Sequence, residues 1–292
     1  GLAIMEHFCI ITNSDKSANH DMAKHIMEYM DKHGKQCIIL ENRMSSSAGI
    51  RHFTDVSKIP GDTECAIVLG GDGTMIQAAI DLVHRELPII GVNTGNLGFL
   101  TEVEQNNVDN ALERLVNNNY EIENRIMLKE ISYFKQPDSR SSCYALNDIV
   151  VSKRGGIRLI TIKVFLNNEL ADIYRADGII ISTPTGSTGY NLSAGGPVLV
   201  PHLKATIVTP ICPHSLNKRS LIVDASDRIT LEVGQTKDTG EDLAVVAADG
   251  RNVGELSTGD RLVIEVPHAV TQIIKLSGIG FYERMREKLN QA

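Results

Sequence analysis

Gly70-Gly71-Asp72-Gly73-Thr74 is a glycine-rich turn that follows the apolar run Cys65-Ala66-Ile67-Val68-Leu69 and precedes a helix-like stretch from Met75 to Val83. An apolar run that leads through glycines into a helix predicts a strand, a tight turn and a helix. Glycine lets the backbone approach a ligand closely, and the unpaired N–H groups of the first helical turn attract anions, above all phosphate. The turn therefore predicts a phosphate-binding strand-turn-helix unit.

Asp72 is the unexpected member of this turn. A bound phosphate repels a carboxylate, unless the carboxylate binds a metal or accepts a proton from the attacking group. We therefore interpret Asp72 as a catalytic residue. The alternative is an ordinary turn in which Asp72 caps the following helix.

Strand-like and helix-like runs alternate through residues 1–119. Apolar runs lie at His7 to Thr12, Gln36 to Leu40 and Pro88 to Asn93, and apolar residues at helical spacing lie between runs. Strands that alternate with helices predict a parallel, Rossmann-like sheet. Because Asn117-Asn118-Asn119 ends this pattern, we expect an α/β domain over residues 1–119.

The pattern changes after Tyr120 to short β-rich runs, with Asn167-Asn168 as a hairpin turn between two of them. We expect a mainly-β domain over residues 120–272. Near the end of the chain, Phe281, Met285 and Leu289 recur at helical spacing. We expect residues 273–292 to form a strand and a helix that pack back on the first domain.

Composition excludes several classes of protein. The chain has 292 residues and a net charge of −7, which argues against a general nucleic-acid-binding protein. Its apolar runs are too short to span a bilayer, so we expect a cytoplasmic protein without a membrane partner. The five cysteines are scattered and odd in number, which favours buried reduced thiols over disulfides. No metal-ligand spacing occurs in the sequence, so we expect no metal site built by the protein itself.

Four further motifs follow the glycine turn: Asn93-Thr94-Gly95-Asn96-Leu97-Gly98-Phe99-Leu100, Asn147-Asp148, Arg175-Ala176-Asp177-Gly178, and a Thr/Gly segment from Ser182 to Pro197. In this order they resemble the bacterial NAD kinases, from about Ile67 to Pro201. The Thr/Gly segment is specific to this resemblance. The glycine turn alone is also similar in diacylglycerol and sphingosine kinases and in phosphofructokinases. Neither G-x-x-x-x-G-K-[ST] nor G-x-G-x-x-G follows a strand, so a P-loop NTPase and a Rossmann dehydrogenase are not supported.

The resemblance implies that ATP donates its γ-phosphoryl group to the 2′-hydroxyl of the adenosine ribose of NAD, which gives NADP. Asp72 matches the proton acceptor of the family. Asn147 and Asp148 match residues that hold ribose hydroxyls, although the family often has Glu at the second position. The remaining positions implied for nucleotide binding are Gly70, Gly71, Gly73, Thr74, Arg175, Asp177, Thr188, Gly189, Tyr190, Asn191, Leu192 and Ser193.

Within the binding segment, Tyr190 is expected to stack on a base, and the alternative is a core aromatic side chain. The resemblance also implies Mg²⁺ or another divalent cation that enters with ATP, and a homo-oligomer, expected to be a tetramer. It leaves open whether polyphosphate replaces ATP. Two other functions remain to be weighed: a lipid kinase of the diacylglycerol or sphingosine type, and a non-catalytic nucleotide-binding regulator.

Overall fold

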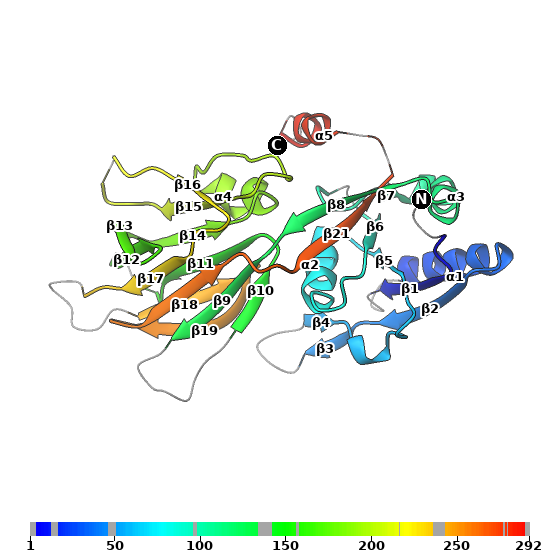
Figure 1. The fold of residues 1–292 in the computed structure, drawn as a ribbon, viewed down its shortest axis with the longest axis horizontal. Helices are drawn as coiled ribbons and strands as arrows, with labels where there is room; N and C mark the ends of the chain where they lie inside the picture. The colour runs from blue at the N-terminus through cyan, green and yellow to red at the C-terminus, as the bar shows by residue number, and fades with distance from the viewer. Residues whose placement is uncertain are drawn as a thin grey trace. The chain divides into compact units, whose positions relative to one another are not determined.

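The chain divides into two compact units (Figure 1). The first comprises Gly1–Arg125 and Val270–Ala292, and the second comprises Ile126–Ala269. The computed structural model describes residues 4–12, 17–45, 51–95, 98–133, 142–155, 158–215, 217–235, 243–276, 278 and 280–289. The boundaries expected from sequence lay after residues 119 and 272. They differ because β8 (Glu121–Ile126) and β21 (Val270–Lys275) are neighbouring strands in the sheet of the first unit.

The first unit is built on a sheet in the order β2-β1-β5-β6-β21-β8, with β7 also paired to β6. The remaining strands are β1 (His7–Thr12), β2 (Gln36–Glu41), β5 (Cys65–Leu69), β6 (Ile89–Asn93) and β7 (Val103–Glu104). The pairs β1 with β2, β1 with β5, β5 with β6, and β6 with β21 are parallel. The expected Rossmann-like sheet is therefore confirmed, and the glycine turn lies at the carboxyl end of its strand β5.

Four α-helices belong to the described part of this unit: α1 (Ser17–Lys32), α2 (Asp72–Asp81), α3 (Val108–Val116) and α5 (Phe281–Leu289). The apolar stripe of α3 is buried, as its spacing predicts. The helix expected at the end of the chain is also present. Its most buried described residue, however, is Arg284 and not one of the apolar residues Phe281 and Met285, which are only half-buried.

Two antiparallel six-stranded sheets make up the second unit, in the orders β10-β9-β20-β17-β12-β13 and β16-β15-β14-β11-β18-β19. The first contains β9 (Leu128–Tyr133), β10 (Ser142–Ala145), β12 (Ile160–Leu166), β13 (Glu169–Ala176), β17 (Ile229–Val233) and β20 (Arg261–Glu265). The second contains β11 (Asp148–Lys153), β14 (Gly178–Ser182), β15 (Ala205–Ile211), β16 (Leu221–Asp224), β18 (Leu243–Ala248) and β19 (Arg251–Ser257). Buried side chains from both sheets form one core, so the sheets pack face to face.

The hairpin turn between β12 and β13 confirms a local prediction. Asn167 and Asn168 have φ values of 49° and 72°, which suit a two-residue turn with both residues left-handed. A short hairpin of β3 (Arg43–Ser45) and β4 (Arg51–Phe53) lies outside the main sheets.

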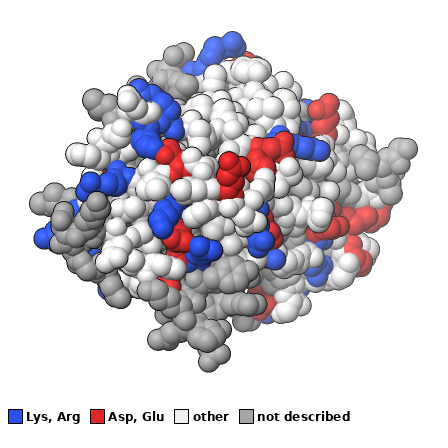
Figure 2. Space-filling model, turned by 60° about the vertical axis from the view of Figure 1, so that its left-hand side comes forward, with Lys and Arg blue, Asp and Glu red and all other residues white. Residues whose placement is uncertain are grey.

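All five cysteines are free. Cys9 and Cys65 are buried, but Cys212 is exposed, so the expectation of buried thiols was wrong for that residue. Among the described residues no helix is both long and apolar enough to cross a membrane. Figure 2 shows one face of the molecule, on which Lys and Arg side chains are interspersed with Asp and Glu side chains.

Candidate active site

The glycine turn of the first unit connects β5 directly to α2. Gly70 has a φ of +153°, and a Cβ at this position would overlap the side chain of Thr74. Only glycine fits there. The helix begins at Asp72, with Gly71 as its N-cap, and so starts three residues before Met75, where the sequence had placed it. In the first turn of α2, the N–H of Thr74 donates to Gly71 O at 3.0 Å, whereas the N–H groups of Asp72 and Gly73 have no acceptor in the described part of the chain.

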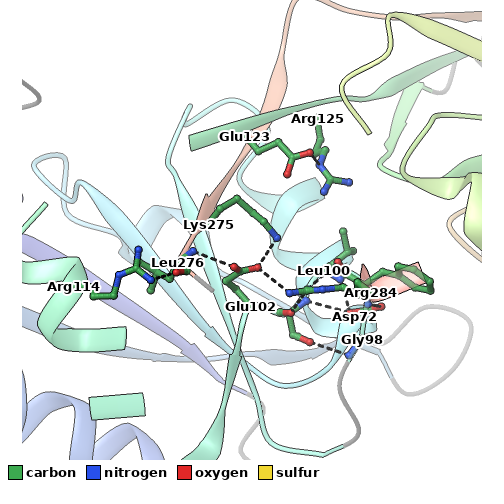
Figure 3. Close-up of polar contacts among 12 residues, drawn as sticks. Asp72, Gly98, Leu100, Glu102, Arg114, Glu123, Arg125, Lys275, Leu276 and Arg284 are labelled. Atoms are coloured by element: carbon green, nitrogen blue, oxygen red, sulfur yellow. Dashed lines mark hydrogen bonds and ion pairs between the residues drawn. The ribbon is translucent and has the colours of Figure 1, made fainter. Parts of the chain in front are cut away.

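Asp72 does not cap its own helix. Its Oδ2 accepts a hydrogen bond from the backbone N–H of Phe99 at 2.7 Å, and its Oδ1 accepts from Leu100 and Thr101 at 3.0 and 3.3 Å (Figure 3). A Cβ at Gly98 would overlap the Asp72 carboxylate, so that position also requires glycine. A carboxylate has about four acceptor positions, and these bonds occupy three. One stays open for a proton donor.

Asn93 is the last residue of β6, which pairs with β5, the strand that leads into the glycine turn. Its Oδ1 accepts the N–H of Gly95 at 2.9 Å. Two residues of this sequence motif, Asn96 and Leu97, lie outside the described residues.

In the second unit, the turn before β11 is held by Asp249. The Asp249 carboxylate accepts the backbone N–H groups of Leu146, Asn147 and Asp148 at 2.7, 2.8 and 3.0 Å. Asp249 is not among the site residues expected from the sequence. In the sequence, the position of Asp249 before Gly250 indicates only a turn. Asp249 reaches Asn147 because β18 pairs with β11, and spacing along the chain does not reveal that pairing.

The Thr/Gly segment packs against the same turn. Thr183 donates its Oγ1–H to Leu146 O at 2.6 Å and its N–H to Asn147 O at 2.9 Å. A Cβ at Gly186 would overlap the backbone of Asn147. The structure thus brings the Thr/Gly segment next to the turn that carries Asn147 and Asp148. Thr183 and Leu146, which form the first of these bonds, lie 37 residues apart in the sequence.

Asp148 is a buried carboxylate whose side chain has no hydrogen-bond partner among the described residues. It is 6% exposed. Burial, and secondarily the negative charge of Asp249, raises the pKa of Asp148 to about 7. Burial also raises the pKa of Asp249, while its three backbone hydrogen bonds oppose the increase. An unpaired buried carboxyl group with a perturbed pKa is typical of a functional site.

The predicted dinucleotide segment forms a short 3-10 helix, η3 (Gly186–Thr188), and a single helical turn, α4 (Tyr190–Ser193). Tyr190 is 48% exposed, which excludes the alternative that it is a core aromatic side chain. Thr188 and Leu192 are half-buried, and Gly189 and Ser193 are exposed. These five residues are therefore at least partly exposed and accessible to a ligand.

Asn191 differs from its neighbours. It is fully buried, its Nδ2 donates to Ser187 O and Pro197 O, and its Oδ1 accepts from Thr209 Oγ1 at 2.7 Å. All three bonds lie within the protein, so the side chain holds the loop in shape. Asn191 stays a predicted dinucleotide-binding position, and with its side chain occupied in this way only its backbone would serve that role.

Arg175 and Asp177 do not pair with each other. Arg175 is exposed at the end of β13, whereas Asp177 forms an ion pair with Lys153 at 2.6 Å. The described residues contain no group of three or more His, Cys, Asp or Glu side chains arranged to hold a metal.

A glycine turn between a parallel strand and a helix, together with a two-sheet unit that carries a buried carboxyl group, is typical of a nucleotide-binding α/β protein with a second, all-β unit. Comparison with known proteins specifies the family. The model of the ATP-NAD kinase N-terminal domain matches residues 8–120, and that of the ATP-NAD kinase C-terminal domain matches residues 146–276. The chain belongs to the ATP-NAD kinase family.

Curated relatives are similar to this chain over almost its full length. The chain is 44% identical over 286 residues to an NAD kinase of Lachnoclostridium phytofermentans, covering 97% of this chain and 99% of the relative. It is 40% identical over 294 residues to an NAD kinase of Lachnospira eligens, covering 98% and 100%. These names confirm the resemblance deduced from the motifs and do not favour a lipid kinase or a regulator.

Two solved structures share the fold. A yeast NADH kinase complexed with NADH superposes with a TM-score of 0.83 at 21% identity, covering 98% of this chain and 88% of that one. An NAD kinase from Archaeoglobus fulgidus in complex with ATP gives a TM-score of 0.74 at 22% identity, covering 98% and 99%.

Proposed function

We propose that this protein phosphorylates NAD, with the γ-phosphoryl group of ATP passing to the 2′-hydroxyl of the adenosine ribose to give NADP. The observation that carries the proposal is Asp72, which lies at the phosphate turn with its carboxylate oriented by three backbone N–H groups and one acceptor position open. Incubating the protein with ATP, Mg²⁺ and NAD, and measuring NADP, tests it. An absence of NADP would contradict the proposal.

Asp72 is the proposed proton acceptor. A sugar hydroxyl is a poor nucleophile, so a carboxylate must take its proton as the new O–P bond forms and ADP leaves. Gly70, Gly71, Gly73 and Thr74 are proposed to bind the phosphates through the turn and the first N–H groups of α2.

Asn147 and Asp148 are the proposed ligands of the ribose hydroxyls. The turn that carries them is fixed by Asp249 on one side and by Thr183 on the other. Because the buried carboxyl group of Asp148 has no hydrogen-bond partner in the part of the chain that the structure describes, a ribose hydroxyl would supply the missing hydrogen bond.

The Thr188 to Ser193 segment is the proposed base-binding element, through its backbone and the Tyr190 ring. Replacing Tyr190 with alanine is expected to raise the KM for NAD more than it lowers kcat, at a cost of about 1–3 kcal/mol, as for other aromatic stacking platforms. Initial-rate kinetics at varied NAD concentration measure this. An unchanged KM would remove Tyr190 from the binding site.

The divalent cation is proposed to enter with ATP as part of the substrate. Mg²⁺ keeps several of its waters and binds through phosphate oxygens, so the turn needs to hold the phosphates and not the bare ion. We propose ATP and not polyphosphate as donor, supported by the Archaeoglobus fulgidus relative that was solved with ATP. Running the same assay with polyphosphate distinguishes the two donors.

A homotetramer is proposed as the working form, with Arg175 and Asp177 completing a neighbour's nicotinamide pocket. Closed symmetric assemblies are the usual state of soluble oligomers. Light scattering is expected to give the mass of four chains. Mixing Asp72→Asn subunits with Asp177→Ala subunits is expected to restore activity, and a monomeric active species would contradict the proposal.

The proposed compartment is the cytoplasm. All five cysteines are free thiols, which suits a reducing environment.

A further inference from the structure

We propose that Arg284 of α5 is a positioning residue for Asp72, because it binds the carbonyl side of the same backbone segment whose N–H side binds the Asp72 carboxylate. The inference rests on the proposed function, in which Asp72 accepts the proton of the ribose hydroxyl. All residues involved belong to the first unit.

Arg284 is a buried cation, 4% exposed. Its Nη1 donates to Thr101 O at 2.8 Å and to Phe99 O at 3.4 Å, and its Nη2 lies 3.3 Å from Glu102 Oε2 (Figure 3). An ion pair with Glu102 alone would not require the two carbonyl contacts. They show that the guanidinium group is fitted to the segment from Phe99 to Glu102.

One peptide group connects the cation to the catalytic carboxylate. The carbonyl oxygen of Phe99 and the N–H of Leu100 belong to the same peptide unit, with Arg284 at its oxygen and Asp72 Oδ1 at its hydrogen. A positive charge at the carbonyl end and a negative charge at the N–H end polarise the peptide in the same direction. Each hydrogen bond therefore strengthens the other.

Glu102 keeps the guanidinium group in place. Its side chain is 0% exposed, and it pairs with Lys275 as well as with Arg284. The N–H of Leu276 donates to Glu102 Oε1 at 3.0 Å, and the N–H of Glu102 itself donates to Gly91 O at 2.9 Å. Burial lowers the pKa of Lys275, and the Glu102 charge opposes this.

Leu276, the residue that follows strand β21, also contacts α3. Arg114 of α3 donates its Nη1–H to the carbonyl oxygen of Leu276. The end of the chain thus contacts the segment from Phe99 to Glu102 through Lys275, Leu276 and Arg284. A carboxylate held this way keeps its orientation while its remaining acceptor position takes a proton.

The test compares Arg284→Met with Arg286→Met. Both residues lie on α5, and Arg286 is exposed, so the control removes the same charge from the same helix. Arg284→Met is expected to lower kcat by roughly 10- to 100-fold, the cost of misplacing a reacting group by about 1 Å. Its KM for NAD is expected to stay close to that of the wild type, because the proposed ribose and base ligands belong to the other unit. Arg286→Met is expected to match the wild type.

Amide hydrogen exchange gives a readout independent of activity. The N–H groups of Phe99, Leu100 and Thr101 are expected to exchange faster in Arg284→Met than in Arg286→Met, because the segment has lost its carbonyl-side contacts. Arg284→Lys keeps the charge beside Glu102 but replaces the planar fork by a single ammonium group. Its kcat is expected to lie between those of wild type and Arg284→Met, and it replaces Arg284→Met if that variant does not fold.

The outcomes separate this inference from the proposed function. A wild-type protein that makes no NADP, or an Asp72→Asn variant with normal turnover, refutes the function or the role of Asp72. If the wild type is active and Asp72→Asn is not, the inference is overturned when the Arg284 variants match Arg286→Met in both kcat and exchange. A raised KM with unchanged kcat would overturn it too.

Discussion

Replacing Asp72 with asparagine is expected to lower kcat by roughly 10²–10⁴-fold, which is the usual contribution of a positioned proton acceptor. The amide at position 72 is a far weaker base than the carboxylate. It also offers only one oxygen to the three N–H groups of Phe99, Leu100 and Thr101, and its NH₂ group would face donors. The free energy of unfolding is therefore expected to fall by about 1–3 kcal/mol as well.

Asp81→Asn is the matched control for this experiment. Asp81 is the last residue of the same helix, and its carboxylate also accepts a backbone N–H, that of Thr54 at 2.8 Å, together with the Gln77 amide. Asp81→Asn is expected to lose stability and to retain kcat. Steady-state kinetics and thermal denaturation of both variants separate the two effects, and equal retention of kcat would make Asp72 a purely structural residue.

Replacing Asp148 with asparagine is expected to stabilise the protein at pH 8 while it weakens NAD binding. Burial and the Asp249 charge raise the pKa of Asp148 from 3.8 to about 7. Because the folded-state pKa is raised, the stabilising contribution of the protonated carboxyl group is complete below pH 3.8 and is lost as the pH rises through about 7. At pH 8 the wild type therefore contains an unpaired buried charge that asparagine removes.

The difference in unfolding free energy between Asp148→Asn and the wild type is expected to be small near pH 4 and on the order of 4 kcal/mol at pH 8. Denaturant unfolding at the two pH values measures it. The KM for NAD is expected to rise in the variant, because the ribose hydroxyls lose one of their proposed ligands. A stability difference independent of pH would show that Asp148 does not titrate in this range.

Asp260→Asn controls for the burial of Asp148. Both aspartates are 6% exposed, but the Asp260 carboxylate accepts the N–H of Ser257 at 2.7 Å. Its replacement is expected to destabilise the protein at both pH values, the reverse of the effect at Asp148. The contrast isolates the missing hydrogen-bond partner as the cause.

Local patterns in the sequence determined much of this protein. The apolar run before Gly70 predicted β5, the glycines predicted the tight turn, and Asn167-Asn168 predicted a left-handed hairpin turn. These features depend on neighbours along the chain, so spacing and backbone preference suffice to find them. The order of the motifs along the chain also indicated the family, because each motif is a continuous stretch of sequence.

The tertiary structure alone decided which residues support the site. Asp249 accepts the backbone N–H of Asp148, 101 residues away in the sequence. Arg284 donates to the carbonyl oxygen of Thr101, 183 residues away. On a helix, Arg284 has the pattern of a solvent-exposed residue, and the apolar periodicity selected Phe281 and Met285 instead. A buried cation becomes favourable only when carbonyl oxygens and a carboxylate from distant segments surround it, because their hydrogen bonds replace the lost water. No local property of the sequence encodes that arrangement.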